Sequence, residues 1–251
     1  MDDNTLAARL AYEAGASLLQ IQSAAMAEGT DPRELKDRGD RESQRLLARL
    51  LHQHRPGDAV LSEEAPDDSA RLDADRVWII DPLDGTREFS EGRDDWAVHV
   101  ALWSDGELTA GAVALPALGR VLTTLDAAPV WQQPKRVRLA VSRTRTTPLV
   151  EALADDLAAE LVPMGSAGYK VASIVRGKAD AYVHAGGQYE WDSAAPIAVA
   201  RAAGLFTSRI DGSPLRYNAA NPYLPDLVVC NPGIAQALLL RIKELMERGL
   251  R

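Results

Sequence analysis

Two aspartates separated by two residues stand directly after an apolar stretch of the chain. Residues 77–80 read VWII and are followed by Asp81, Pro82, Leu83 and Asp84. A continuous apolar run is typical of a strand buried on both faces, so we expect both carboxylates at the end of one buried strand. Pro82 fixes a backbone angle between them. Two rigidly held carboxylates, with the Leu83 carbonyl as a further oxygen, are suitable ligands for Mg²⁺.

Gly85 and Thr86 follow the second aspartate, where we expect a helix to begin. Backbone N–H groups at a helix start favour an anion, and the helix dipole adds to this preference. The segment therefore predicts a cation site beside an anion site, an arrangement suited to a metal-bound phosphate.

Further acids occur at comparable positions along the chain. Glu63, beside Glu64, follows a short apolar stretch, Asp192 opens an alanine-rich segment, and Asp40 opens another helical pattern. Each also has a structural explanation, because acids commonly form turns, helix caps or solvated loop pairs. The recurrence of acids at the ends of strands and the starts of helices favours a shared metal site.

The elements that must position these acids follow from local periodicity and turn signals. We predict helices over 5–26, 40–54, 148–159, 165–176, 192–203 and 234–248. We predict strands over 59–61, 77–80, 96–103, 108–115, 119–125, 130–133, 138–142, 179–184 and 227–230. The first half mixes helices with hairpins (α+β) and the second alternates strand and helix (α/β). Residues 134–136 are the predicted junction, so residues 1–134 and 135–251 form the two predicted subdomains.

The overall composition restricts the class of partner. The chain has 251 residues, a net charge of −8 and a pI of about 5.1. This acidic balance disfavours binding to nucleic acid or anionic membranes. The N-terminus does not resemble a signal peptide, and no apolar run approaches the ~18 residues of a membrane span. The single cysteine, Cys230, excludes an intrachain disulfide and suits a reducing cytoplasm.

The ordered motifs resemble the inositol monophosphatase superfamily. The segments that carry the resemblance are SEE (62–64), DPLDGT (81–86) and WDSAA (191–195), which together span most of the chain. The Arg-Glu-Phe at 87–89 and the later segments GSAGYK, YVHAGGQYEWDSAAP and DGSPLRYN resemble the CysQ-type branch, especially its actinobacterial members. The resemblance implies a layered αβαβα sandwich and a Mg²⁺-dependent, lithium-sensitive phosphatase. The CysQ branch removes the 3′-phosphate of 3′-phosphoadenosine 5′-phosphate and acts in sulfur assimilation.

The resemblance also implies residue roles. Two or three Mg²⁺ ions would be held by Glu63, Asp81, Asp84, Asp192 and the Leu83 carbonyl. The implied catalytic residues are Asp40, Thr86 and Glu63, with Asp40 and Thr86 orienting the attacking water. Asp40 lies in KDRGD, where the family usually has Val-Thr before the residue that precedes this aspartate.

The substrate contacts are expected mainly in the second half of the chain. Gly165 and Ser166 start a helix that could reach ribose or the phosphate that is not cleaved, and Lys170 lies one helical turn further on. Arg216 and Arg87 could pair with the 5′-phosphate, because a guanidinium matches phosphate geometry. The full predicted substrate set is Asp84, Gly85, Thr86, Arg87, Gly165, Ser166, Lys170, Asp192 and Arg216. Neither role is required by the residue type: Arg216 could be a solvated surface residue, and Lys170 could extend along its helix toward solvent.

Three alternatives stay open from the sequence. The enzyme could instead cleave inositol 1-phosphate or fructose 1,6-bisphosphate, although Ala185, Gly186 and Gly187 lack the glutamate that inositol-cleaving relatives tend to carry there. The chain could be a non-catalytic metal-binding protein of the same fold. An aspartate nucleophile is also open, whereas Cys230 lacks the setting that activates a thiol. The sequence leaves open whether the protein forms a homodimer.

Overall fold

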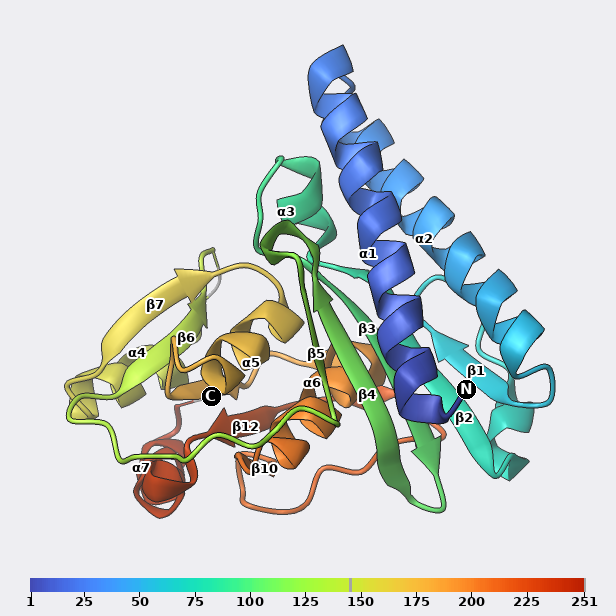
Figure 1. Ribbon diagram of the computed structural model, residues 1–251. Helices are drawn as coiled ribbons and strands as arrows, with labels where there is room; N and C mark the ends of the chain where they lie inside the picture. Colours follow the sequence, from blue (N-terminus) through green and yellow to red (C-terminus); the bar gives the residue numbers. More distant parts are fainter. Residues whose placement is uncertain (145, 251) are drawn as a thin grey trace.

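Two five-stranded sheets and seven helices form five layers in the computed structural model, which describes residues 1–144 and 146–250 (Figure 1). The strand order of the first sheet is β1-β2-β3-β4-β5, with β1 parallel to β2 and the other pairs antiparallel. Its strands are β1 (Ala59–Ser62), β2 (Arg76–Asp84), β3 (Ala97–Ser104), β4 (Glu107–Leu115) and β5 (Arg120–Thr123).

The second sheet has the order β10-β12-β8-β6-β7. Only β6 pairs in parallel, with β7 and β8, while β12 is antiparallel to both β8 and β10. Its strands are β6 (Arg138–Ser142), β7 (Glu160–Met164), β8 (Ala181–His184), β10 (Phe206–Ser208) and β12 (Leu227–Cys230); β9 (Gln188–Tyr189) and β11 (Tyr223–Leu224) form a separate ladder.

The helices α1 (Asp3–Glu28) and α2 (Pro32–His54) run side by side over the outer face of the first sheet (Figure 1). The Asp2 side chain caps α1 by accepting from the Thr5 amide, and Gly29 ends it in the left-handed conformation. Leucines at helical spacing, including Leu6, Leu10 and Leu18, are fully buried against this sheet.

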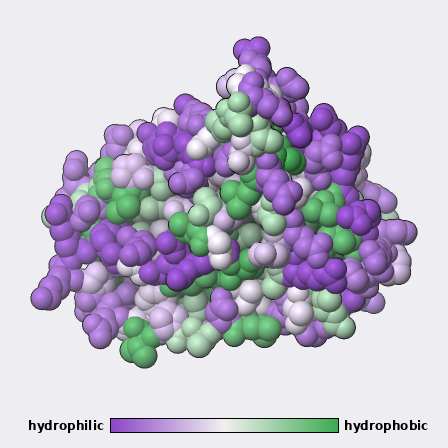
Figure 2. Space-filling view, turned by 45° about the horizontal axis from the view of Figure 1, so that its top comes forward, coloured by the Kyte–Doolittle hydropathy of each residue, from purple (hydrophilic) through white to green (hydrophobic). Residues whose placement is uncertain are grey.

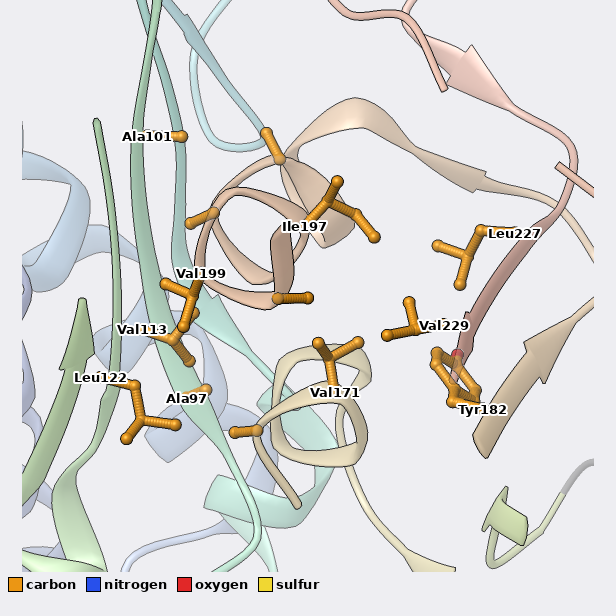
Figure 3. Packing of buried hydrophobic residues seen from close by; sticks show 14 of the residues in the cluster. Ala97, Ala101, Val113, Leu122, Val171, Tyr182, Ile197, Val199, Leu227 and Val229 are labelled. Carbon is orange, nitrogen blue, oxygen red and sulfur yellow. The ribbon is translucent and has the colours of Figure 1, made fainter. Parts of the chain in front are cut away.

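The helices α5 (Ala167–Val175) and α6 (Glu190–Ala202) fill the space between the two sheets. Figure 3 shows Val171 of α5 and Ile197 and Val199 of α6 between side chains of both sheets, among them Val113 and Val229. The helices α4 (Pro148–Asp156) and α7 (Ala235–Glu247) cover the outer face of the second sheet, and the short helix α3 (Thr86–Ser90) follows β2. This arrangement confirms the predicted αβαβα sandwich.

The face drawn in Figure 2 carries many hydrophilic residues, with hydrophobic residues in separate patches between them. Among the described residues, no helix is both long and apolar enough to cross a membrane. The two sheets lie on either side of the predicted junction at residue 134, but α5 and α6 share one core with the first sheet. The division into two subdomains therefore stays a prediction.

Several local predictions differ from the structure, and the short strands β9, β10 and β11 were not predicted. The second helix begins at Pro32 and not at Asp40. Gly39 lies within this helix, where the Cβ atom of any larger residue would come within 2.6 Å of the Phe89 ring, so the close packing of Phe89 requires glycine. Residues 130–133 are not a strand, so that prediction was wrong. The edge strand β7 was missed, because Pro163 and its exposed positions give it no strand pattern.

Candidate active site

The carboxylates at the end of β2 are held in an irregular, buried turn. The pairing of β2 with β3 shifts between Asp81 and Asp84, which displaces Pro82 and Leu83 from the ladder. The Leu83 amide donates to Asp81 Oδ1 at 3.0 Å, and the Ser43 hydroxyl donates to the Pro82 carbonyl at 2.6 Å. Asp81 and Asp84 are 1% and 6% exposed, so both carboxylates are fixed inside the protein.

Helix α6 brings a third carboxylate to the same point. Asp192 lies in the first turn of α6 and accepts from the Tyr189 amide at 2.7 Å, so it caps the helix from the third helical position and not from the predicted first one. Oxygen atoms of Asp81, Asp84 and Asp192 all lie within 4.8 Å of one another. We refer to these three residues as the acidic cluster.

The electrostatics of the acidic cluster favour a bound cation. Burial, followed by repulsion from Glu63, raises the pKa of Asp81 well above its usual value. Burial and repulsion from Asp84 raise the pKa of Asp192 to about 6. Burial alone would raise the pKa of Asp84. The neighbouring His99 has the opposite effect, and the net pKa of Asp84 is lowered. Buried like charges at this separation are costly unless a positive ion compensates them, so the donor set fits Mg²⁺.

Glu63 lies near the acidic cluster, and Asp40 lies near Glu63. Glu63 is exposed and lines the adjoining cleft, and partial desolvation of its carboxyl group with repulsion from Asp192 raises its pKa to about 7. Asp40 is buried in α2, where burial and repulsion from Glu64 raise its pKa to about 7. The Thr86 hydroxyl donates to the Leu83 carbonyl at 3.3 Å.

A cleft of about 700 Å³ opens beside the acidic cluster. This volume is in the range of small-molecule sites. Its lining includes the carboxylates of Asp84, Asp192 and Glu63, which we call the first wall. The rest of the lining, which we call the second wall, comes from the second half of the chain and includes Ser142, Thr146, Lys170, Tyr182, His184, Gly186, Gln188, Tyr189 and Trp191.

Two aromatic rings form a flat part of this second wall. Tyr189 is stacked on Trp191 with ring centroids 4.7 Å apart and an interplanar angle of 9°. Tyr189 is 45% exposed although its ring is already stacked on one face. Such a ring presents a rigid surface to a planar ligand. Tyr217, the other tyrosine that could be considered for stacking on a base, is buried, and its hydroxyl lies 3.1 Å from that of Ser193.

The start of α5 does not present free amides to the cleft. The amides of Ala167 and Gly168 donate to the two oxygens of Asp84 at 3.2 and 2.6 Å. The Gly165 amide donates to Asp95 Oδ2 at 2.6 Å, and the Ser166 hydroxyl caps α5 at the Tyr169 amide. Among the described residues, Gly165 and Ser166 are therefore not part of the cleft lining.

Lys170 lines the cleft but is only 5% exposed. Its ammonium group donates to the carbonyls of Gly165 and Ser166 and lies 5.3 Å from the centre of the Tyr182 ring. Burial lowers the pKa of Lys170. The side chain thus places a cation directly under the cleft.

The remaining predicted contacts lie outside the lining of this cleft, as far as the described residues show. Arg87 is exposed and pairs with Glu91 at 2.8 Å, and Arg216 is exposed. Gly85 has a φ of 90°, and a side chain there would approach Ser166 Cβ to 2.9 Å. Gly85 therefore allows the turn after β2 to contact the start of α5.

Two residues near the site were missed. His99 on β3 is fully buried, with Nε2 3.2 Å from Asp84 Oδ2. Burial lowers the pKa of His99, but Asp84 outweighs this and the net pKa is raised. Asp95 pairs with Arg93 at 2.8 Å and accepts from Gly165. A lone histidine in an otherwise apolar strand was the one sequence signal available.

Comparison with known proteins places the chain among phosphatases. The sequence profile of the inositol monophosphatase family matches residues 3–245. A 3′-phosphoadenosine 5′-phosphate phosphatase of Mycobacterium leprae is 52% identical over 98% of this chain and 96% of its own length. A protein of the same name from Mycobacterium bovis is 54% identical over 90% of this chain and 88% of its own. The crystal structure of CysQ from Bacteroides thetaiotaomicron superposes with a TM-score of 0.76 at 26% identity, covering 91% of this chain and 97% of that one.

Proposed function

This chain belongs to the inositol monophosphatase family, and from this premise we propose that it hydrolyses the 3′-phosphate of 3′-phosphoadenosine 5′-phosphate to give AMP and phosphate. The observation that carries the proposal is the acidic cluster, which faces a cleft with a stacked aromatic wall. Water supplies the new oxygen on phosphorus, the bond from phosphorus to the ribose 3′-oxygen breaks, and that oxygen keeps the electron pair and takes a proton.

The residues that would hold Mg²⁺ are Asp81, Asp84, Asp192 and Glu63, with the carbonyl of Leu83; two or three ions are expected. When bound, Mg²⁺ supplies positive charge and Lewis acidity toward the phosphate. The acidic cluster supports this proposal because two buried carboxylates and the half-buried Asp192 have oxygen atoms within 4.8 Å of one another. The chain is acidic overall, so phosphate binding without this positive charge is disfavoured.

The chain's own groups orient the attacking water. Thr86 is held by the Leu83 carbonyl at the end of β2, close to the acidic cluster. Asp40 has a pKa of about 7, which suits a group that accepts a proton near neutral pH. We therefore assign Asp40 and Thr86 to water positioning and proton transfer, with Glu63 linking this group to the cation site.

The second wall of the cleft favours a nucleotide over a polyol. The exposed face of Tyr189 provides a stacking surface for a base, whereas Ala185, Gly186 and Gly187 provide no carboxylate for sugar hydroxyl groups. Lys170 contributes positive charge beneath the same wall. Arg87 and Arg216 lie outside the cleft lining, so we retain them only as contacts for a 5′-phosphate that extends beyond it.

The test is a substrate panel with Mg²⁺: 3′-phosphoadenosine 5′-phosphate, inositol 1-phosphate and fructose 1,6-bisphosphate. We expect the largest kcat/KM for the nucleotide, loss of activity with a chelator, and inhibition by Li⁺. A preference for inositol phosphate would overturn the proposed substrate and favour the polyol alternative. Absence of Mg²⁺-dependent turnover on all three would instead favour a non-catalytic protein.

We also propose a cytoplasmic enzyme of sulfur assimilation: the CysQ-type resemblance implies the pathway, and a single buried, unpaired cysteine suits a reducing compartment. Burial raises the pKa of Cys230 to about 12, which supports the assignment of water and not a thiol as the nucleophile.

A further inference from the structure

The buried ring of His99 contacts Asp84 of the acidic cluster and the peptide unit next to Asp192. His99 lies on β3, is 0% exposed, and its ring contacts the starts of α5 and α6. Its Nε2 lies 3.2 Å from Asp84 Oδ2, and its Nδ1 lies 3.1 Å from the Trp191 carbonyl. A carbonyl can only accept a hydrogen bond, so Nδ1 donates to Trp191.

This contact links two ligands that are distant in the sequence. Trp191 directly precedes Asp192, so the imidazole ring connects the Asp84 carboxylate to the peptide unit beside the Asp192 side chain. The separation between Asp84 and Asp192 determines whether both can bind one cation. A single rigid ring therefore controls a distance that neither β2 nor α6 sets alone.

The surrounding packing leaves the ring no freedom to move. A side chain at Gly168 would come within 1.9 Å of His99 Nε2, so only glycine fits there. The Gly168 amide also donates to Asp84 Oδ2 at 2.6 Å. Asp84 is thus held from one side by the start of α5 and from another by His99.

We propose that His99 is a positioning residue, which holds Asp84 and the Asp192 segment at the separation required to bind a divalent cation. The inference rests on the proposed metal-dependent function. A purely structural role would have a different signature, because loss of a core side chain lowers stability without changing the geometry of the carboxylates.

Three substitutions separate the two contacts of the ring. In His99→Asn the short amide reaches about as far as Nδ1, so it keeps the Trp191 contact and loses the Asp84 contact. In His99→Gln the longer amide reaches about as far as Nε2 and keeps the Asp84 contact. His99→Ala loses both. Val113→Ala is the matched control, because Val113 pairs with His99 across β3 and β4 and is buried in the same layer.

The measurement is Mg²⁺ affinity by isothermal titration calorimetry, with no substrate present, together with the free energy of unfolding in EDTA. We expect the Kd for Mg²⁺ to rise about 10–100-fold in His99→Ala and His99→Asn, as is typical when a group that orients a metal ligand is removed. His99→Gln should also weaken Mg²⁺ binding, because it loses the Trp191 contact and so no longer links the two segments, and Val113→Ala should lose stability with an unchanged Kd. At saturating Mg²⁺ the kcat of His99→Asn should largely recover.

Two outcomes would overturn the inference. One is a Kd for His99→Asn equal to that of Val113→Ala, which would make His99 an ordinary core residue. The other is an unchanged Kd in His99→Gln, which would show that the Trp191 contact contributes nothing and that the ring does not link the two segments. Because calorimetry needs no substrate, failure of the nucleotide assignment would appear separately, as Mg²⁺ binding without turnover.

Discussion

The two walls of the cleft are built in opposite ways. On the wall of the acidic cluster, Asp81 and Asp84 are almost completely buried and each accepts hydrogen bonds from backbone amides. On the aromatic wall, Tyr189 is 45% exposed and is held mainly by ring contacts with Trp191 and Tyr223. The first wall fixes charged groups at defined separations, and the second offers an exposed surface.

The difference has a physical reason. Buried carboxylates are tolerated only when their surroundings hold and compensate them, so this wall needs support from several elements at once. A base that stacks on an aromatic ring needs only area and orientation. Substitutions in the first wall should therefore affect every substrate, whereas those in the second should affect the choice among substrates.

The largest expected effect comes from the acidic cluster. Asp84→Asn should lower kcat on all substrates by at least about a thousandfold, since loss of cation binding removes several kcal/mol of transition-state stabilisation. The fold should persist, because the amide oxygen can still accept from Gly168. The measurement is Mg²⁺-dependent phosphate release with circular dichroism. The control is Asp126→Asn, at an exposed acid that accepts a hydrogen bond from the Thr123 amide; its kcat should equal that of the unmodified protein. Substantial activity in Asp84→Asn would contradict the assignment.

A smaller and selective effect is expected in the aromatic wall. Tyr189→Ala should lower kcat/KM for 3′-phosphoadenosine 5′-phosphate by about 5–150-fold, because stacking contributes about 1–3 kcal/mol per base. The rate on inositol 1-phosphate should change little, because the amide of residue 189 still donates its hydrogen bond to the Asp192 carboxylate. Tyr12→Ala, at an exposed tyrosine on α1, is the control. Equal loss on both substrates would show that Tyr189 is structural.

A third effect concerns the free energy of unfolding in the absence of metal. The pKa of Asp40 is raised to about 7 in the folded protein, so the folded state binds more protons than the unfolded state between about pH 4 and 7. This contribution is present at low pH and is lost as pH rises through 7. Its upper limit is about 4 kcal/mol, because a pKa difference of one corresponds to about 1.4 kcal/mol.

Asp40→Asn should therefore flatten the fall in the free energy of unfolding between pH 5 and pH 8, measured by urea denaturation in EDTA. Glu34→Gln, at an exposed acid on the same helix that does not act on Asp40, should leave that slope unchanged. If Asp40→Asn and the unmodified protein show the same slope, Asp40 does not titrate in this range.

Local patterns predicted much of the fold. The leucine spacing predicted α1, and the Asp105-Gly106 turn between β3 and β4 has positive φ at both residues, as a tight hairpin requires. The strand over 227–230 was correct to the residue. The edge strand β7 was missed because its pairing partner and not its own pattern makes it a strand.

The candidate site was predictable only in part. The acids of DPLDGT and Asp192 could be chosen from their positions at element ends, and the structure brings three of them together. The role of the α5 start could not be predicted from the sequence. Its amides donate to Asp84, which lies 84 positions away from Gly168. A helix start that looks free in the sequence is already occupied by an internal anion.

The sequence by itself determined most of the helices and central strands and which carboxylates stand at their ends, because periodicity and turn residues act over a few positions; it did not determine the edge strand β7. Tertiary structure alone decided how far apart the carboxylates lie, that α5 holds Asp84, and that His99 joins it to Trp191, 92 positions further on. Contacts over such separations depend on how the layers pack, and no local pattern records that packing.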